Sequence, residues 1–168
     1  KLNLEEIQSN SIKEIATQFS TPTFVYDAEV ILRRVAELSE FDVVRYAQKA
    51  NSNLAVLALM KQQGVVLDAV SAGEIHRALR VGYQGGSDAS GRHEIVYTAD
   101  IFDQDALALV QEHSIHVNCG SVDMIEQLGK VASGVEITLR INPGFGHGHS
   151  EKTNTGGSQS KHGIWHEQ

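Results

Sequence analysis

The chain has 168 residues, of which 41% are hydrophobic and 21% are charged, a composition typical of a folded globular protein rather than a disordered tail. Its formal net charge of −7, from 21 acidic and 14 basic residues, gives phosphate backbones little to bind, so we expect no nucleic-acid partner. The longest strictly apolar run, Leu54 to Met60, is far shorter than the roughly 20 residues of a membrane span, so we expect no membrane partner either.

The first part of the chain favours short helices. Apolar residues at near-helical spacing between Leu4 and Phe19 predict one or two of them, and Thr21-Pro22-Thr23 ends this stretch. Phe24 to Tyr26 is a brief β-type run. Asp27 is a suitable N-cap for a further helix over residues 28–38, which has an apolar stripe.

From residue 43 onward, short β-branched runs alternate with helical patterns. The predicted strands cover residues 43–47, 65–70, 95–98, 115–118 and 135–141. The predicted helices follow the first four strands and cover residues 55–62, 72–81, 104–113 and 122–131. Because strands and helices alternate at steps of about 20 to 28 residues, they predict βαβ units and a parallel sheet.

Two architectures contain such units, a doubly wound open sheet and a closed barrel of eight strands. Polar residues favour the barrel, because they fall at or just past the C-terminal ends of successive strands, where a barrel assembles its active site. These residues are Lys49, Ser71, Thr98, Asn118 and Asn142. A complete barrel takes about 250 residues. We therefore predict an α/β fold, a (β/α)8 TIM barrel of which the chain holds only about the first five strands.

Three side chains near the first two strands are candidates for chemistry. Lys49 lies between a strand and a helix, where a poorly hydrated amine can act as a nucleophile or Schiff-base partner. By position alone, an ordinary solvated lysine remains an alternative. Asp68, inside the second strand, needs a partner to stay ionised. Glu74 forms an S-x-x-E pair with Ser71, which is also the pattern of a helix capping box.

The remaining reactive side chains give weaker signals. After Asn142 comes a polar, glycine-rich stretch of about twenty residues, and long loops of this kind are usually functional or disordered. Its His147 and His149 suggest either a lid that meets substrate or phosphate or a plain loop, and their spacing argues against a metal site. Cys119 is best explained as a small buried apolar residue. Because a single cysteine cannot form an internal disulfide, we expect the cytoplasm as compartment.

Four segments together resemble a known family. They are residues 23–27 (TFVYD), 45–51 (RYAQKAN), 68–74 (DAVSAGE) and 139–144 (LRINPG). In order and spacing they are similar to the alanine-racemase-like group of pyridoxal-phosphate enzymes, and within it to the diaminopimelate decarboxylases. The Y-A-x-K-A-N element is specific when D-x-x-S-x-G-E follows about twenty residues later, as here.

The resemblance implies roles for individual residues. Lys49 matches the lysine that forms a Schiff base with pyridoxal 5′-phosphate, and Asp68 and Glu74 match acidic positions close to the cofactor. Arg140 matches an arginine that faces the cofactor ring. The family's T-G…S-K-F-G segment, which follows a mobile loop, corresponds to residues 155–163 here. The loop itself is residues 144–163, and its candidates for substrate or lid contacts are His147, His149, Ser160 and Lys161. Two departures from the family pattern are His162 in place of phenylalanine and Gln48 in place of a small or apolar residue.

The resemblance also implies an organisation and a reaction. Residues 1–26 belong in part to a second, β domain, and residues 27–168 form the first part of the cofactor-binding barrel. The phosphate loop, the acid at the pyridine nitrogen, a stacking histidine and an active-site cysteine from a second subunit of a homodimer all lie further along. The implied reaction is decarboxylation of meso-diaminopimelate to L-lysine and CO₂. Alternatives are a decarboxylase for ornithine, arginine or carboxynorspermidine, an amino-acid racemase, a non-catalytic pyridoxal-phosphate-binding protein and a cofactor-free Schiff-base aldolase.

Overall fold

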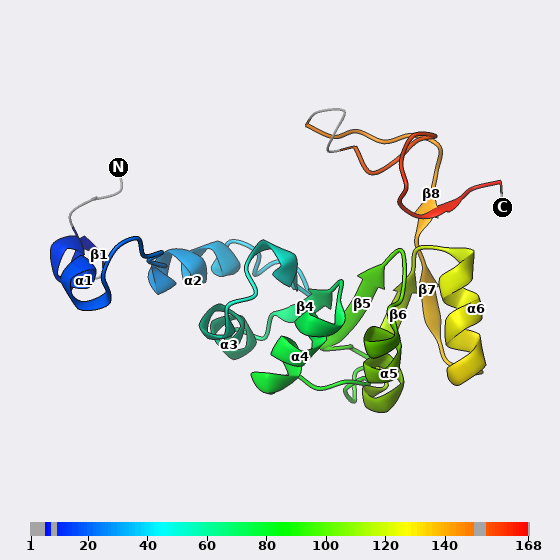
Figure 1. The fold of residues 1–168 in the computed structure, drawn as a ribbon, viewed down its shortest axis with the longest axis horizontal. Coiled ribbons are helices and arrows are strands. Elements are labelled where there is room, and N and C mark those ends of the chain that lie inside the picture. The colour runs from blue at the N-terminus through cyan, green and yellow to red at the C-terminus, as the bar shows by residue number, and fades with distance from the viewer. Residues whose placement is uncertain (1–5, 8–9, 150–153, 168) are drawn as a thin grey trace. The chain divides into compact units, whose positions relative to one another are not determined.

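The computed structural model describes residues 6–7, 10–149 and 154–167, and it divides into two compact units, Lys1–Val44 and Arg45–Gln168 (Figure 1). The elements of the first unit are β1 (Glu6–Ile7), β2 (Asn10–Ser11), α1 (Ile12–Phe19) and α2 (Ala28–Ala36). The two short strands pair antiparallel.

The predictions for this unit hold in part. The Asp27 side chain caps α2 as predicted, accepting hydrogen bonds from the backbone N–H groups of Glu29 and Val30. The β-type run at residues 24–26 was a wrong prediction, because no strand of the described chain pairs with it and its backbone is irregular. Of the helical stretch predicted from Leu4 to Phe19, residues 4–5 and 8–9 lie outside the described residues.

The second unit is built on one parallel sheet. Its five strands are β3 (Arg45–Ala47), β4 (Val66–Ala69), β5 (Ile95–Ala99), β6 (His116–Cys119) and β7 (Ile137–Leu139). Their order in the sheet equals their order in the chain. The helices between them are α3 (Leu54–Gln62), α4 (Ala72–Arg80), α5 (Gln104–His113) and α6 (Val122–Val131). In Figure 1 the helices run beside the sheet in the same order. The predicted alternation of strand and helix is therefore confirmed.

The two faces of this sheet differ in polarity, which decides between the two architectures. One face contributes to the buried apolar core, through Leu67 of β4, Tyr97 of β5 and Val117 of β6. Asp68 and Thr98 are the next residues along two of these strands, and they point to the opposite face. Helices therefore pack on one face of a sheet whose strand order never reverses, which is the pattern of a (β/α) barrel and not of a doubly wound sheet.

The last predicted strand, residues 135–141, is divided in the structure. Its second part is β8 (Ile141–Asn142), which pairs in parallel with β9 (Ile164–Trp165). The chain between them returns to its own strand, so that the Ile164 N–H donates to the Arg140 carbonyl oxygen at 2.8 Å. Gly163 permits this approach, because its φ is 81° and a Cβ there would lie 3.0 Å from the Arg140 oxygen.

Two absences apply to the described residues. None of their helices is both long and apolar enough to cross a membrane. They also contain no group of three or more His, Cys, Asp or Glu side chains that could hold a metal ion. The expectation of no metal site is therefore not contradicted, and it stays a prediction.

Candidate active site

A cavity of about 730 Å³ lies at the C-terminal ends of the strands of the second unit. Residues at or just past the C-terminal ends of β3 to β7, together with the segment that leads into β9, form its wall. The titratable side chains of the wall are Lys49, Asp100, Asp123, Arg140, Lys161 and His162. This is the end of the sheet at which a barrel places its active site.

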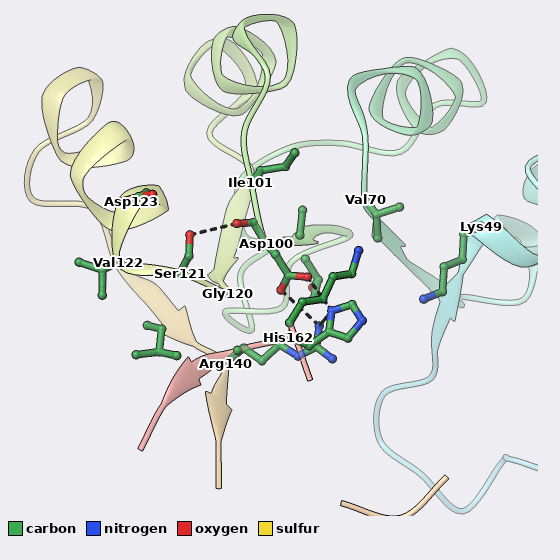
Figure 2. Close-up of a pocket in the computed structure, with 15 residues that line it drawn as sticks. Lys49, Val70, Asp100, Ile101, Gly120, Ser121, Val122, Asp123, Arg140 and His162 are labelled. Atoms are coloured by element: carbon green, nitrogen blue, oxygen red, sulfur yellow. Dashed lines mark hydrogen bonds and ion pairs between the residues drawn. The ribbon is translucent and has the colours of Figure 1, made fainter. Parts of the chain in front are cut away.

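Lys49 reaches the cavity from a 3₁₀ turn, Gln48–Ala50, that directly follows β3. Figure 2 shows its amine directed toward the side on which Asp100, Arg140 and His162 lie. The side chain is exposed to solvent, so the predicted poor hydration of the amine is not found in the described chain. The reason is that β3 is an edge strand of the five-stranded sheet and no further strand of the described residues borders it.

Gln48, the residue before Lys49, is completely buried. Neither its side-chain oxygen nor its nitrogen has a hydrogen-bond partner among the described residues. A buried unpaired carboxamide costs stability. We have no structural explanation for a polar side chain at this position.

Arg140 lies between β7 and β8 and contacts two other residues of the cavity wall. Its Nη1 is 3.7 Å from Asp100 Oδ1 and 3.5 Å from His162 Nδ1. The imidazole in turn lies 2.6 Å from Asp100, between Nδ1 and Oδ2. All three side chains are partly buried, with exposed fractions of 31% for Arg140, 29% for His162 and 23% for Asp100. They form one charged cluster on the cavity wall (Figure 2).

Asp68 lies on the polar face of the sheet and does not line the cavity. Burial raises the pKa of its carboxyl group, and this effect exceeds the opposing effects of a hydrogen bond from Thr98 and of three positive charges. Those charges are Arg45, Lys49 and Arg140. Asp68 is therefore within electrostatic range of Lys49 and Arg140, the two cavity residues that the family resemblance places near the same cofactor.

Glu74 also does not line the cavity, and its contacts are those of a helix cap. Its Oε2 accepts a hydrogen bond from the Val70 N–H at 2.9 Å, and its own N–H donates to Ser71 Oγ at 3.3 Å. The side chain is buried, with 9% of its surface exposed. In the described chain the carboxylate thus satisfies backbone at the start of α4. The Ser71 side chain caps the Glu74 N–H as the capping-box alternative predicts, but the carboxylate accepts from the Val70 N–H and not from that of Ser71.

The four loop candidates separate into two groups. His147 and His149 are exposed and do not line the cavity. Lys161 does line it, and Ser160 accepts a hydrogen bond at Oγ from the His162 N–H at 3.2 Å. Residues 150–153 of the predicted mobile loop lie outside the described residues.

The sequence analysis did not identify Asp100 as a site residue. It also did not predict that His162 contacts Asp100. A signal for Asp100 was present, because it follows Thr98 by two positions and therefore continues the same polar face beyond the end of β5. The contact between Asp100 and His162 joins residues 62 positions apart, and no local pattern predicts it.

Comparisons with known proteins agree with this geometry. Residues 28–168 match the family model described as pyridoxal-dependent decarboxylase, pyridoxal binding domain. Diaminopimelate decarboxylase of Escherichia coli K12 is 52% identical over 161 residues, which are 96% of this chain and 38% of that protein. The corresponding protein of Streptomyces coelicolor is 54% identical over 152 residues, which are 90% of this chain and 34% of that protein. The chain therefore spans between a third and two fifths of these relatives.

Solved structures show the same likeness. A crystal structure of a diaminopimelate decarboxylase superposes with a TM-score of 0.82 at 55% identity, covering 90% of this chain and 35% of the other. The Helicobacter pylori enzyme complexed with L-lysine superposes with a TM-score of 0.75 at 26% identity, covering 90% and 40%. The predicted fold, the first part of an alanine-racemase-type barrel, is thereby confirmed. The matched domain, the identity to these relatives and the shared fold show that the chain belongs to the pyridoxal-dependent decarboxylase family.

Proposed function

We propose that this chain is the first part of the cofactor-binding barrel of an enzyme that decarboxylates meso-diaminopimelate to L-lysine and CO₂. The observation that carries the proposal is that Lys49 and Arg140, two of the residues matched from the family pattern, line one cavity at the C-terminal ends of the strands. Relatives at 52% and 54% identity are named for this reaction, which supports the choice of substrate.

The residues on the cavity wall fit pyridoxal 5′-phosphate. This cofactor offers an aldehyde, an aromatic ring and an anionic phosphate, and the wall offers a primary amine and two further cations, Arg140 and Lys161. A volume of about 730 Å³ lies within the usual range of small-molecule pockets. One carboxylate oxygen, Asp100 Oδ1, is buried with no hydrogen-bond partner among the described residues, as expected where a polar ligand completes a site.

Lys49 would hold the cofactor through its aldehyde, and Arg140 would face its ring. When bound, the cofactor supplies an electron sink for the pair of electrons left by the departing carboxylate. Arg140 contributes guanidinium N–H groups that can donate to an anionic oxygen beside it. Asp68 places a carboxylate within electrostatic range of Lys49 and Arg140. Glu74 is proposed as a second acidic group near the cofactor, in addition to its contact with Val70.

We further propose the organisation that the family resemblance implies. Residues 1–26 belong in part to a β domain, residues 27–168 begin the barrel, and residues 144–163 form a lid whose His147, His149, Ser160 and Lys161 approach the substrate. The open edges of β3 and β7 support a barrel that further strands complete. A homodimer with a shared active site and a cytoplasmic location complete the proposal, and the unpaired, buried Cys119 is consistent with a reducing compartment.

A product assay tests the proposal. The intact protein, loaded with pyridoxal phosphate, is incubated separately with meso-diaminopimelate, ornithine, arginine and carboxynorspermidine, and both CO₂ and the amine product are measured. We expect CO₂ and L-lysine from meso-diaminopimelate at a rate far above that of the other substrates. CO₂ from another substrate alone would identify another decarboxylase, and inversion of an amino acid without CO₂ would identify a racemase. Binding of the cofactor without any turnover would support a non-catalytic protein.

A further inference from the structure

Arg140 and His162 both lie close to the carboxylate of Asp100. Asp100 Oδ2 is 2.6 Å from His162 Nδ1, whereas Asp100 Oδ1 is 3.7 Å from Arg140 Nη1. The first distance is that of a short hydrogen bond and the second is too long for one. Because a carboxylate oxygen only accepts, Nδ1 carries the proton of the short hydrogen bond to Asp100. The 3.5 Å contact between Nδ1 and Nη1 is then a contact of two donors beside the same carboxylate.

Asp100 is held in place from two directions. Its backbone carbonyl accepts a hydrogen bond from Ser121 Oγ at 3.0 Å. Its carboxylate lies against Gly120, where an added Cβ would be 2.5 Å from Oδ1. The backbone carbonyl and the carboxylate of Asp100 thus both lie against the segment Gly120–Ser121.

His162 is also placed by its neighbours in the chain. Its N–H donates to Ser160 Oγ at 3.2 Å, and the next residue, Gly163, has the positive φ that leads into β9. In Figure 2 the edge of the imidazole opposite Asp100 faces the side of the cavity on which Lys49 lies.

We propose that His162 is a positioning residue that occupies Asp100 and thereby keeps Arg140 available to the cofactor. An arginine and a carboxylate that meet without a competitor form a bidentate pair with two parallel hydrogen bonds. Here the imidazole is hydrogen-bonded to Oδ2, and Arg140 lies outside hydrogen-bond distance of Oδ1, which has no hydrogen-bond partner among the described residues. Its N–H groups remain free to donate into the cavity. This inference rests on the proposed function for its consequence, since it is the cofactor that Arg140 would face.

When the imidazole is removed, we expect Arg140 to pair with Asp100 and no longer to donate to the cofactor. In His162→Phe, Asp100 can turn both oxygens to the guanidinium and form the bidentate pair. Loss of one charge-assisted contact from Arg140 should then raise the dissociation constant of pyridoxal phosphate about tenfold or more. His162→Asn keeps a side-chain N–H near the position of Nδ1 and should restore most of the affinity.

The double variant His162→Phe/Asp100→Asn separates this role from a merely structural one. An amide has only one oxygen and no charge, so it cannot form the bidentate pair, and the double variant should bind the cofactor more tightly than His162→Phe alone. If His162 served only to stabilise the local fold, the second substitution would leave the affinity unchanged or lower it further. His76→Phe, at an exposed position on α4, is the matched control and should keep the affinity of the unaltered protein.

The experiment has two readouts. The apo form of the intact protein and of each variant is titrated with pyridoxal phosphate, and crystal structures of the cofactor-free proteins give the distance between Arg140 and Asp100. We expect a bidentate pair in His162→Phe and no such pair in the unaltered protein. Arg140 unmoved in His162→Phe, or a double variant without recovery, would overturn the inference. If the unaltered protein does not bind the cofactor at all, the proposed function fails, and the crystal structures still decide whether His162 keeps Arg140 from Asp100.

Discussion

Asn142 and Gly157, 15 residues apart in the chain, are joined by two hydrogen bonds. The Asn142 Nδ2 group donates to the Gly157 carbonyl at 3.0 Å, and the Gly157 N–H donates to Asn142 Oδ1 at 2.9 Å. The same oxygen accepts a third hydrogen bond, from the Gly144 N–H at 3.1 Å. The buried amide of Asn142 thus closes the base of the glycine-rich loop.

We predict that Asn142→Ala opens this loop. The substitution removes three hydrogen bonds from a buried position, and each lost bond to a buried group costs about 1–3 kcal/mol. Limited proteolysis of the intact protein should cut within residues 144–157 several times faster than before. Asn154→Ala removes a single hydrogen bond among the described residues, that from the Gly156 N–H, and should have a smaller effect. Equal cleavage rates in both variants would contradict the role of Asn142.

For Asp68 we predict opposite effects on stability and on cofactor binding. Its pKa is raised by burial, so the folded state holds the proton more tightly than the unfolded state. Ionisation of the carboxyl therefore lowers the stability as the pH rises from the ordinary carboxyl pKa of 3.8 through the folded-state pKa. Asp68→Asn should raise the free energy of unfolding of the apo protein at pH 7 and weaken the binding of pyridoxal phosphate.

Denaturant unfolding at two pH values checks the sign of this effect. The gain from Asp68→Asn should be present at neutral pH and absent well below 3.8, where the carboxyl is protonated in both states. A variant that is less stable than the unaltered protein at pH 7 would show that the carboxylate stabilises the fold.

Glu74 has two interpretations that one pair of variants can separate. As a cap, its carboxylate satisfies the Val70 N–H, so Glu74→Ala should cost about 1–3 kcal/mol of stability. Glu74→Gln retains an acceptor oxygen and should cost much less. If Glu74 also acts on the cofactor through its charge, Glu74→Gln should weaken cofactor binding while the free energy of unfolding stays nearly unchanged. Ser71→Ala, which removes the N-cap of the same helix, should cost about 1 kcal/mol and leave cofactor affinity alone.

The pair of stacked imidazoles at His93 and His116 predicts a pH dependence of stability. Their ring centroids are 4.5 Å apart. The pKa of His116 is lowered from the ordinary imidazole value of 6.5, first by burial and then by the charges of His93 and Arg45, against the opposing effect of Glu136. The unfolded state therefore takes up the proton first, and the stability contributed by neutral His116 is lost as the pH falls from 6.5 through the folded-state pKa.

His116→Phe should remove this part of the pH dependence. Urea unfolding midpoints of the apo protein, measured above and below pH 6.5, should differ less in His116→Phe than in the unaltered protein. His76→Phe, which changes an exposed histidine, should keep the original difference. An unchanged pH dependence in His116→Phe would mean that another group is responsible.

Much of the fold could be predicted because its signals are local. The four βα units, the parallel sheet and the position of Lys49 all follow from hydrophobic periodicity and from polar residues at the ends of strands. The pairing of β8 with β9 could not be predicted in this way, because it joins Ile141 to Ile164 across the polar loop. The prediction of a strand at residues 24–26 was wrong for the same kind of reason, because a strand also needs a partner strand and the local sequence does not show one.

The candidate site shows a similar limit. Lys49 and Arg140 were found from motifs, and the structure places both on the cavity wall. The hydrogen bond between Asp100 and His162 depends on the tertiary fold alone. The hydration of Lys49 depends on what borders β3 on the side opposite β4, and no strand of the described residues lies there.

The most direct test of the account concerns Lys49. The intact protein is loaded with pyridoxal phosphate, reduced with borohydride and digested, and mass spectrometry locates the resulting pyridoxyl group. The account predicts this group on Lys49, its loss in Lys49→Ala, and its retention in Lys130→Ala, which changes an exposed lysine outside the cavity. A pyridoxyl group on Lys161 or any other lysine of the unaltered protein, or none at all, would contradict it.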